Sequence, residues 1–273
     1  MRELYSKFFM VTGRLVYYFH IWWIMSRNSF QSILYVKVAF LIFLIGKILR
    51  FGFFIGFIYF LIKGTGSLAD YSLNQTIFFF LTFNLIDITT QFLFREVYRF
   101  RPMVVSGRLD LVLVKPVNAL FRVLMGGADI IDLITIPPLL ISLLYIGNQL
   151  NPTFFQVVLY IVLVANGLMI ATAFHIAVLA MGIITLEIDH TIMIFRDTIS
   201  LGKFPVEIYR EPIRSILTYL IPIGIMISLP TKALIGLASL QAVVISLILG
   251  IGSIFLSVKF WNYSLKFYSS ASS

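Results

Sequence analysis

The sequence predicts an all-α polytopic membrane protein with six transmembrane helices. Of its 273 residues, 60% are hydrophobic and only 12% are charged, and the mean hydropathy is +0.98. Soluble domains are typically less apolar. The apolar runs are about 20 residues long, as a bilayer-spanning helix requires, and they lack the strict alternation of β-barrel strands. We therefore expect residues 1–273 to form a single transmembrane domain.

The distribution of basic residues predicts the orientation of this domain. Residues 95–122 hold six of the 21 Lys and Arg residues and lie between two apolar segments. Basic loops stay in the cytoplasm, so this loop and both termini, including the tail 259–273, are predicted to be cytoplasmic. The segments 63–75 and 147–152 are nearly free of basic residues and are predicted to be external. We attribute the formal net charge of +9 to contact with anionic lipid, and not with nucleic acid.

Residues 1–36 differ from the rest of the chain because they are moderately polar and rich in aromatic residues. Tyr17, Trp22 and Trp23 accompany polar residues such as Arg27. This mixture is typical of a helix that lies in the cytoplasmic membrane interface with its rings at headgroup depth. A tilted, partly buried lead-in to the first span explains it equally well.

Four long apolar segments predict the first four spans. They cover residues 39–62, 76–94, 123–146 and 154–185. Lys47 and Arg50 lie inside the first span, where a charge at mid-bilayer costs about 3 kcal/mol, so we expect them to snorkel or to face protein. Pro137 and Pro138 lie inside the third span and are expected to kink or break it, because proline removes a backbone donor.

The segment 186–230 allows two arrangements. Residues 186–214 are too rich in charge for a lipid-exposed span, and the apolar stretch 215–230 is short and contains two prolines. The segment forms either a cytoplasmic loop followed by a short span, or a polar, protein-buried span followed by a broken, re-entrant hairpin on the outer face. With the last span at 234–258, the total is six in both arrangements.

The sequence lacks the signatures of ATP hydrolysis and of nucleophilic catalysis. A Walker A loop requires Gly-x-x-x-x-Gly-Lys-Ser/Thr. The two Gly-Lys pairs, at 46–47 and 202–203, are followed by Ile48 and Phe204. The chain has no Cys and no Gly-x-Ser-x-Gly elbow. We therefore predict no catalytic residue and no ATPase activity in this chain.

A metal site is not predicted either. No H-E-x-x-H motif is present, and the only local cluster of metal-ligating residues is Glu187, Asp189 and His190. A solvated charged loop explains these three residues better than metal ligation does.

Three polar residues inside the predicted spans are candidates for lining a polar path: Asp87, Asn166 and His175. An ion pair with Lys47 or Arg50 of the neighbouring span is the favoured explanation of Asp87, because ionisable residues inside a membrane are costly unless they are paired. Asn166 and His175 lie nine residues apart, near one helix face. Hydrogen bonds between helices are their favoured role, and substrate contact is the second.

The basic loop 95–122 has the features of a docking element for a soluble partner. Arginines precede Pro102, the pair Ser106-Gly107 favours a turn, and residues 109–114 are mostly apolar. We expect a short helix that breaks before Pro102, a turn and an apolar run, folded as a hairpin. A plain basic loop on anionic lipid is the alternative, but it does not require the apolar run. The residues predicted to bind the partner are Arg95, Glu96, Arg99, Arg101, Ser106, Arg108 and Asp110.

Three segments resemble known sequence signatures. They are VVSGRLDLVLVKPVNALFRVL at 104–124, KFPVEIYREPIRSILTYLIPIGIMISLPTKALIG at 203–236 and YSSASS at 268–273. In this order they resemble bacterial ABC transporter permeases of the type-2 exporter (ABC-2-like) class, in the branch of permeases that occur as related pairs. The resemblance extends over nearly the whole chain and says nothing of the cargo.

This resemblance implies a six-span permease with an N-terminal interface helix at about 16–35. It also implies a cytoplasmic coupling helix at about 96–111 and an outer re-entrant hairpin at about 205–230. The chain would work in the bacterial cytoplasmic (inner) membrane, with a second permease that is the same or a related chain and with two ATP-binding subunits. Those subunits would bind ATP and Mg, and this chain would bind no cofactor. The coupling helix would transmit ATP hydrolysis to substrate export.

Two other functions compete with this interpretation. An ion-coupled secondary transporter would move protons through Asp87, Asp129 or His175, but it predicts inverted repeats that are not evident in the sequence. A membrane assembly protein without transport activity would not need an apolar docking run in a basic loop.

Overall fold

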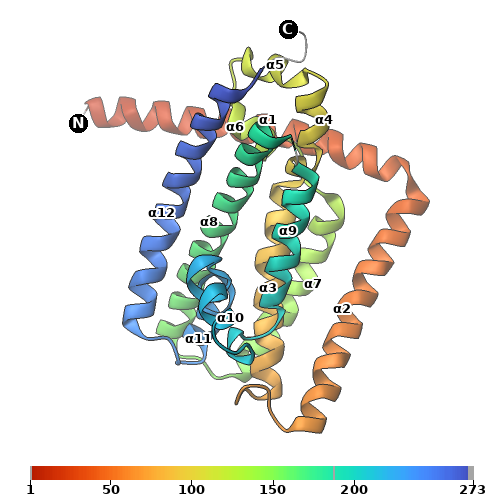
Figure 1. The fold of residues 1–273 in the computed structure, drawn as a ribbon, viewed down its shortest axis with the longest axis vertical. Coiled ribbons are helices and arrows are strands. Elements are labelled where there is room, and N and C mark those ends of the chain that lie inside the picture. The colour runs from red at the N-terminus through yellow and green to blue at the C-terminus, as the bar shows by residue number, and fades with distance from the viewer. Residues whose placement is uncertain (1, 187, 270–273) are drawn as a thin grey trace.

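The long helices of the computed structural model, which describes residues 2–186 and 188–269, stand side by side as a bundle (Figure 1). Five of them are long and apolar enough to cross a membrane. They are α2 (Lys37–Thr65), α3 (Leu73–Leu93), α7 (Ile130–Gln149), α8 (Phe154–Thr185) and α12 (Leu240–Ser264). No strand occurs in the part of the chain that the structure describes. The predicted all-α polytopic fold is confirmed.

A bent pair of short helices supplies the sixth apolar segment. Its two arms, Ile213–Leu220 and Gly224–Leu234, meet at 73° and together are long and apolar enough to form a broken span or a re-entrant loop. The first arm comprises α10 (Ile213–Ser215) and the π-helical turn η4 (Ile216–Leu220). The second comprises the π-helical turn η5 (Gly224–Ser228) and α11 (Leu229–Leu234).

The polar segment before this pair forms α9 (Ile188–Ser200), which packs against α8, and the 3-10 turns η2 (Leu201–Lys203) and η3 (Val206–Ile208). At 1.5 Å per residue, the 13 residues of α9 extend over about 20 Å, less than the hydrocarbon thickness of a bilayer. The broken hairpin agrees with the second of the two arrangements predicted for 186–230. The protein-buried span of that arrangement is wrong, because α9 is too short to be a span and exposes side chains such as Met193 and Ile194.

The N-terminal segment forms one helix, α1 (Arg2–Tyr35), that runs across an end of the bundle and not along it (Figure 1). The chain turns at Val36, where φ is −95° and ψ is 69°, and continues as α2. Ser26 of α1 is buried, and its Oγ accepts a hydrogen bond from the backbone N–H of Ala128 at 3.2 Å. The orientation of α1 across the end of the bundle agrees with the predicted interface helix and not with a tilted lead-in to the first span.

The loop between α3 and α7 folds into four short helices at the same end of the bundle as α1 and the end of α12 (Figure 1). They are η1 (Arg95–Arg99), α4 (Phe100–Val105), α5 (Arg108–Leu113) and α6 (Ala119–Leu124). We call this the basic end. The predicted break before Pro102 is present, since η1 ends at Arg99, where φ is −108° and ψ is 6°, and Pro102 lies in the first turn of the next helix, α4. Proline is tolerated there because the N–H groups of a first turn have no partner within the helix.

The third span starts later than predicted, and its prolines do not break it. It begins at Ile130 and not near residue 123, because residues 119–124 form α6 and Asp129 caps α7 by accepting a hydrogen bond from the Ile131 N–H at 2.8 Å. The helix runs through Pro137 and Pro138 without the break that they could have caused. Packing of α7 against α3 through buried residues such as Leu143 holds it in place.

Candidate functional site

Helices α4 and α5 form a compact hairpin at the basic end. Gly107 joins them with a φ of 70°, in the left-handed region that glycine adopts without strain. The Ser106 hydroxyl donates a hydrogen bond to the Pro102 carbonyl at 2.6 Å and accepts one from Arg108 Nε at 3.0 Å. These contacts confirm the predicted turn and hairpin.

The inner face of the hairpin is buried against the ends of the long helices. Phe100 and Leu109 are fully buried and belong to one apolar cluster with Leu179 of α8 and Trp261 of α12. The same cluster includes Ile192 of α9. Since packed side chains cannot move past one another freely, a displacement of the hairpin is transmitted to these three helices.

The outer face of the hairpin combines exposed apolar and basic side chains. Val105, Leu111 and Val114 are 58%, 61% and 80% exposed, and Arg101 and Arg108 beside them in sequence are exposed too. We define these five residues as the outer face. Exposed apolar residues that gather beside charged ones are typical of a surface that binds a protein.

The predicted docking residues divide into two groups. Glu96 is buried and accepts a hydrogen bond from Arg122 Nη1 at 3.1 Å, and Arg95 Nε lies 3.2 Å from Asp129 Oδ2. Arg95 therefore holds the loop to the start of α7, and Glu96 joins the two ends of the loop, η1 and α6. Exposed positions are occupied by Arg99, Arg101, Ser106 and Arg108.

Asp110, the last predicted docking residue, lies next to the C-terminal segment. Burial, and after it the neighbouring Asp110 carboxylate, raises the pKa of Tyr268 to about 12. Tyr268 also packs on the apolar cluster beneath the hairpin. The segment that follows α12 thereby becomes part of the basic end. The rest of the predicted terminal signature, residues 270–273, lies outside the described residues.

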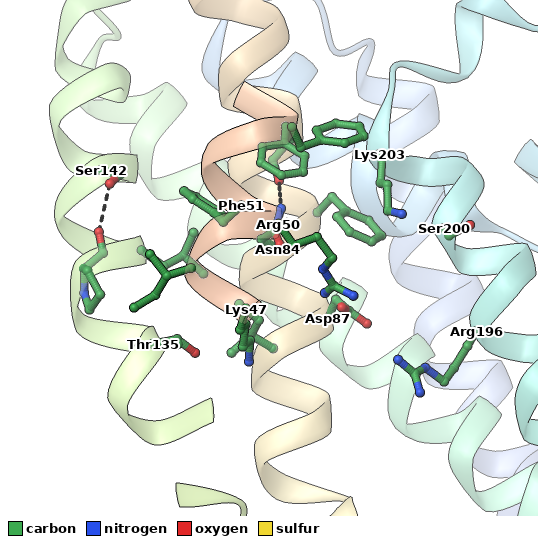
Figure 2. Close-up of a pocket in the computed structure, with 17 residues that line it drawn as sticks. Lys47, Arg50, Phe51, Asn84, Asp87, Thr135, Ser142, Arg196, Ser200 and Lys203 are labelled. Atoms are coloured by element: carbon green, nitrogen blue, oxygen red, sulfur yellow. Dashed lines mark hydrogen bonds between the residues drawn. The ribbon is translucent and has the colours of Figure 1, made fainter. Parts of the chain in front are cut away.

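A cavity of about 230 Å³ lies deeper in the bundle, between α2, α3, α7 and α9 (Figure 2). Its charged lining consists of Asp87 and four basic residues, Lys47, Arg50, Arg196 and Lys203. Phenylalanines from α2 and α3 form much of the remaining wall. These residues come from segments that lie far apart in the sequence.

The predicted ion pair of Asp87 with Lys47 or Arg50 is wrong. Lys47 pairs with Asp132 of α7, while Asp87 Oδ2 accepts a hydrogen bond from Gln91 Nε2 at 2.8 Å. Arg50 points toward Asp87 across the cavity without forming an ion pair (Figure 2). The sequence shows both carboxylates but not which one the neighbouring helix brings close to Lys47.

Asn166 and His175 do not line this cavity. Asn166 Nδ2 donates hydrogen bonds to the Ser246 carbonyl oxygen at 3.0 Å and to Ser246 Oγ at 2.7 Å. The favoured role of Asn166, a hydrogen bond between helices, is confirmed. His175 is buried, with Nδ1 2.8 Å from the carbonyl oxygen of Ala171 on its own helix, so the hydrogen bond between helices predicted for His175 is wrong. Among the three path candidates, the structure places only Asp87 at the cavity.

Arg196 and Lys203 are cavity residues that sequence reasoning did not single out. Both belong to the charged segment 186–214, and their shared position becomes apparent only when α9 packs beside α8 and η2 beside α3. Among the described residues, no three His, Cys, Asp or Glu side chains come together as metal ligands. Glu187 of the predicted local cluster lies outside the described residues, as does the side chain of Asp189.

Comparison with known proteins identifies the family. A family model described as "ABC-2 family transporter protein" matches residues 47–272, which is most of the chain. Neither curated proteins nor solved structures give a match. The chain therefore belongs to the ABC-2 transporter family and is a multi-pass permease subunit of an ABC transporter.

Proposed function

We propose that this chain uses the hairpin α4–α5 to receive the energy of ATP hydrolysis from a separate ATP-binding subunit and couples it to substrate export. One observation carries the proposal. The hairpin is buried on its inner face in a cluster shared with α8, α9 and α12, and its outer face is exposed, apolar and basic. A partner bound to the outer face can therefore move these three helices together.

The chemistry of ATP belongs to the partner. The chain contains no Walker A sequence, which would cradle phosphates with backbone amides and a Lys. ATP and Mg are bound by the ATP-binding subunit, and members of this family generally work with such subunits. The hairpin acts as a lever, and this chain binds no cofactor.

The working assembly contains two ATP-binding subunits and a second permease, which is the same chain or a related one. The weak internal packing of α2 supports the second permease. Only Ile58 and Ile62 are buried in this helix, which leaves most of its apolar surface exposed. Each permease presents one hairpin, so a pair recruits two ATP-binding subunits.

The assembly lies in the bacterial cytoplasmic (inner) membrane, with the basic end and both termini in the cytoplasm. Residues 95–122 carry six Lys and Arg residues, and this excess is what the positive-inside rule assigns to the cytoplasm. Helix α1, which crosses the basic end, is the proposed interface helix.

The test is recovery of an ATP-binding subunit with the tagged chain from its native membrane in mild detergents. Photolabelling by azido-ATP identifies the subunit. We compare wild type with Leu111→Glu on the outer face. Leu237→Glu is the matched control, because Leu237 is also 61% exposed but lies in the loop after α11.

We expect wild type and the control to retain the subunit, while Leu111→Glu loses it about tenfold or more, as for a residue at the centre of an interface. Recovery of no ATP-binding subunit with wild type in several detergents contradicts the proposal. If Leu111→Glu recovers as much of the ATP-binding subunit as wild type does, the outer face is not the surface that binds this subunit.

A further inference from the structure

The cavity between α2, α3, α7 and α9 has an excess of positive charge. Lys47, Arg50, Arg196 and Lys203 line it, and the carboxylates nearby are Asp87 and, paired with Lys47, Asp132. Four cations less two carboxylates leave a formal charge of +2. Lys47, Asp87 and Thr135 lie well inside α2, α3 and α7, so the cavity is within the membrane-spanning part of the bundle.

Three of these cations have no ion pair within the described residues. Arg196 lies over the ring of Tyr98 at 5.7 Å, and Lys203 over the ring of Phe54 at 5.7 Å. Arg50 faces Asp87 without pairing with it (Figure 2). Cations held inside a membrane protein are costly unless an anion or water compensates them, and intramembrane charges therefore mark ligand sites.

The other part of the cavity wall is aromatic. Phe54 and Phe80 stack with ring centroids 4.4 Å apart, and Phe51 lies 5.3 Å from Phe80. Phe83 and Leu139 extend this wall. A ligand in the cavity therefore meets cations from α2, α9 and η2 together with apolar rings from α2 and α3.

We propose that this cavity holds the phosphate-bearing head group of an anionic amphiphile, and that amphiphiles of this class are what the permease moves. The second clause rests on the proposed function. Arginine offers a planar fork that matches phosphate oxygens, and lysine adds a mobile point charge. Arg50, Arg196 and Lys203 supply both kinds of donor around one space (Figure 2).

The apolar tail of the ligand lies along the phenylalanines and leaves the cavity beside α2. This helix packs only weakly on the bundle, with Ile58 and Ile62 as its buried residues, and the cavity reaches it through Lys47 and Phe51. A volume of about 230 Å³ accommodates a head group but not a whole lipid, so the tail must lie outside the cavity.

Lipid binding to the delipidated, detergent-purified chain, measured by native mass spectrometry, tests the proposal. The probes are phosphatidic acid and phosphatidylcholine with identical acyl chains, and inorganic phosphate as a competitor. The cavity variant is Arg50→Gln with Arg196→Gln. Its control, Lys63→Gln with Arg210→Gln, removes the same charge at exposed positions outside the cavity. A third protein, Arg50→Lys with Arg196→Lys, keeps the charge without the guanidinium fork.

Wild type and the control are expected to bind phosphatidic acid about tenfold or more tightly than phosphatidylcholine. The phosphate of phosphatidylcholine is a diester with one negative charge, and its choline group adds a positive charge that the cavity cations repel. The cavity variant loses this preference, and the Arg→Lys protein keeps part of it. Equal binding of both lipids by wild type overturns the proposal, and so does an equal loss in the control. If inorganic phosphate at the same concentration displaces the lipid completely, the ligand is a free anion, and the proposal of an amphiphile is overturned.

ATP hydrolysis by the chain with its ATP-binding subunit, reconstituted in nanodiscs, separates this inference from the proposed function. Phosphatidic acid should stimulate turnover of wild type and of the control, but not of the cavity variant. Stimulation that survives in the cavity variant overturns the assignment of the cavity to the transported substrate. Lipid preference in a chain that recovers no ATP-binding subunit supports the binding site and overturns the proposed function.

Discussion

Asn166 of α8 donates from one nitrogen, Nδ2, to both the carbonyl oxygen and the hydroxyl of Ser246 on α12, at 3.0 and 2.7 Å. The close approach depends on Gly250, because a Cβ at that position would overlap Asn166 Oδ1. Helices α8 and α12 both pack against the hairpin α4–α5 at the basic end. Deep in the bundle they are held together by the amide of Asn166, which fits because Gly250 has no side chain.

Gly250→Ala should destabilise the protein by about 1–3 kcal/mol, since the added methyl group overpacks a buried contact. Gly252→Ala is the control on the same helix, because a Cβ there meets nothing within 4 Å. Alanine is the better helix former by about 1 kcal/mol, so the control should be neutral or stabilising. Thermal unfolding in detergent measures both, and equal midpoints would contradict the prediction.

Asp132→Asn should destabilise the protein by about 3–5 kcal/mol, because it leaves Lys47 charged and without its partner inside the bundle. Replacing both residues, Lys47→Met with Asp132→Leu, should restore most of the loss, since well-packed apolar residues often replace a buried ion pair without penalty. Unfolding midpoints of the two variants test this, and a double variant as unstable as the single one would refute it.

Glu96→Gln should loosen the loop at the basic end, because Glu96 is buried and accepts from Arg122. We expect a loss of about 1–3 kcal/mol, as for a hydrogen bond between charged groups. The comparison is Arg99→Gln. The Arg99 side chain is half exposed and its Nη1 lies 3.9 Å from Glu96, so this ion pair should contribute less than about 1 kcal/mol. Limited proteolysis within 95–122 measures the difference, and equal cleavage rates would speak against the prediction.

Stability should fall at alkaline pH through Tyr71, in the loop between α2 and α3. Its side chain is 7% exposed, and burial, followed by the nearby Glu207 carboxylate, raises its pKa to about 12. The unfolded phenol ionises near pH 10, so the unfolded state binds fewer protons from there upward. The stabilising contribution is complete below about pH 10 and is lost as pH rises to about 12, by at most about 3 kcal/mol.

Tyr71→Phe keeps the ring, whose centroid lies 4.8 Å from that of Phe79, and removes the ionisable hydroxyl. Unfolding midpoints at pH 9 to 11.5 should therefore decline less steeply for this variant than for wild type. Parallel curves would show that other groups cause the alkaline loss.

The parts of the fold that depend on neighbouring residues were predictable from the sequence. Helix α8 begins at Phe154 and ends at Thr185, as expected, because Thr153 and Gln156 form a capping box and Leu186 ends the helix with a left-handed φ of 60°. The apolar runs that form α2 and α3 are equally local signals. Spans of this length are visible in composition alone.

The contacts between distant segments were not predictable. Asp132 lies 85 residues from Lys47, and the helix rotation that selects it over Asp87 is set by packing of whole helices. The short helices α4 and α5 have six residues each, too few for a helical period to identify. The cavity residues Arg196 and Lys203 were read as part of a charged segment, since nothing local indicates that they face Arg50.

The two-sided hairpin has a consequence for how such permeases diverge. The residues that attach it to the bundle, such as Phe100 and Leu109, are buried, whereas Leu111 and Val114 of the outer face are exposed. Surface substitutions usually change stability by less than about 0.5 kcal/mol. After duplication of its gene, a permease can therefore acquire a new recognition surface in a few mutations, while the machinery beneath is inherited unchanged.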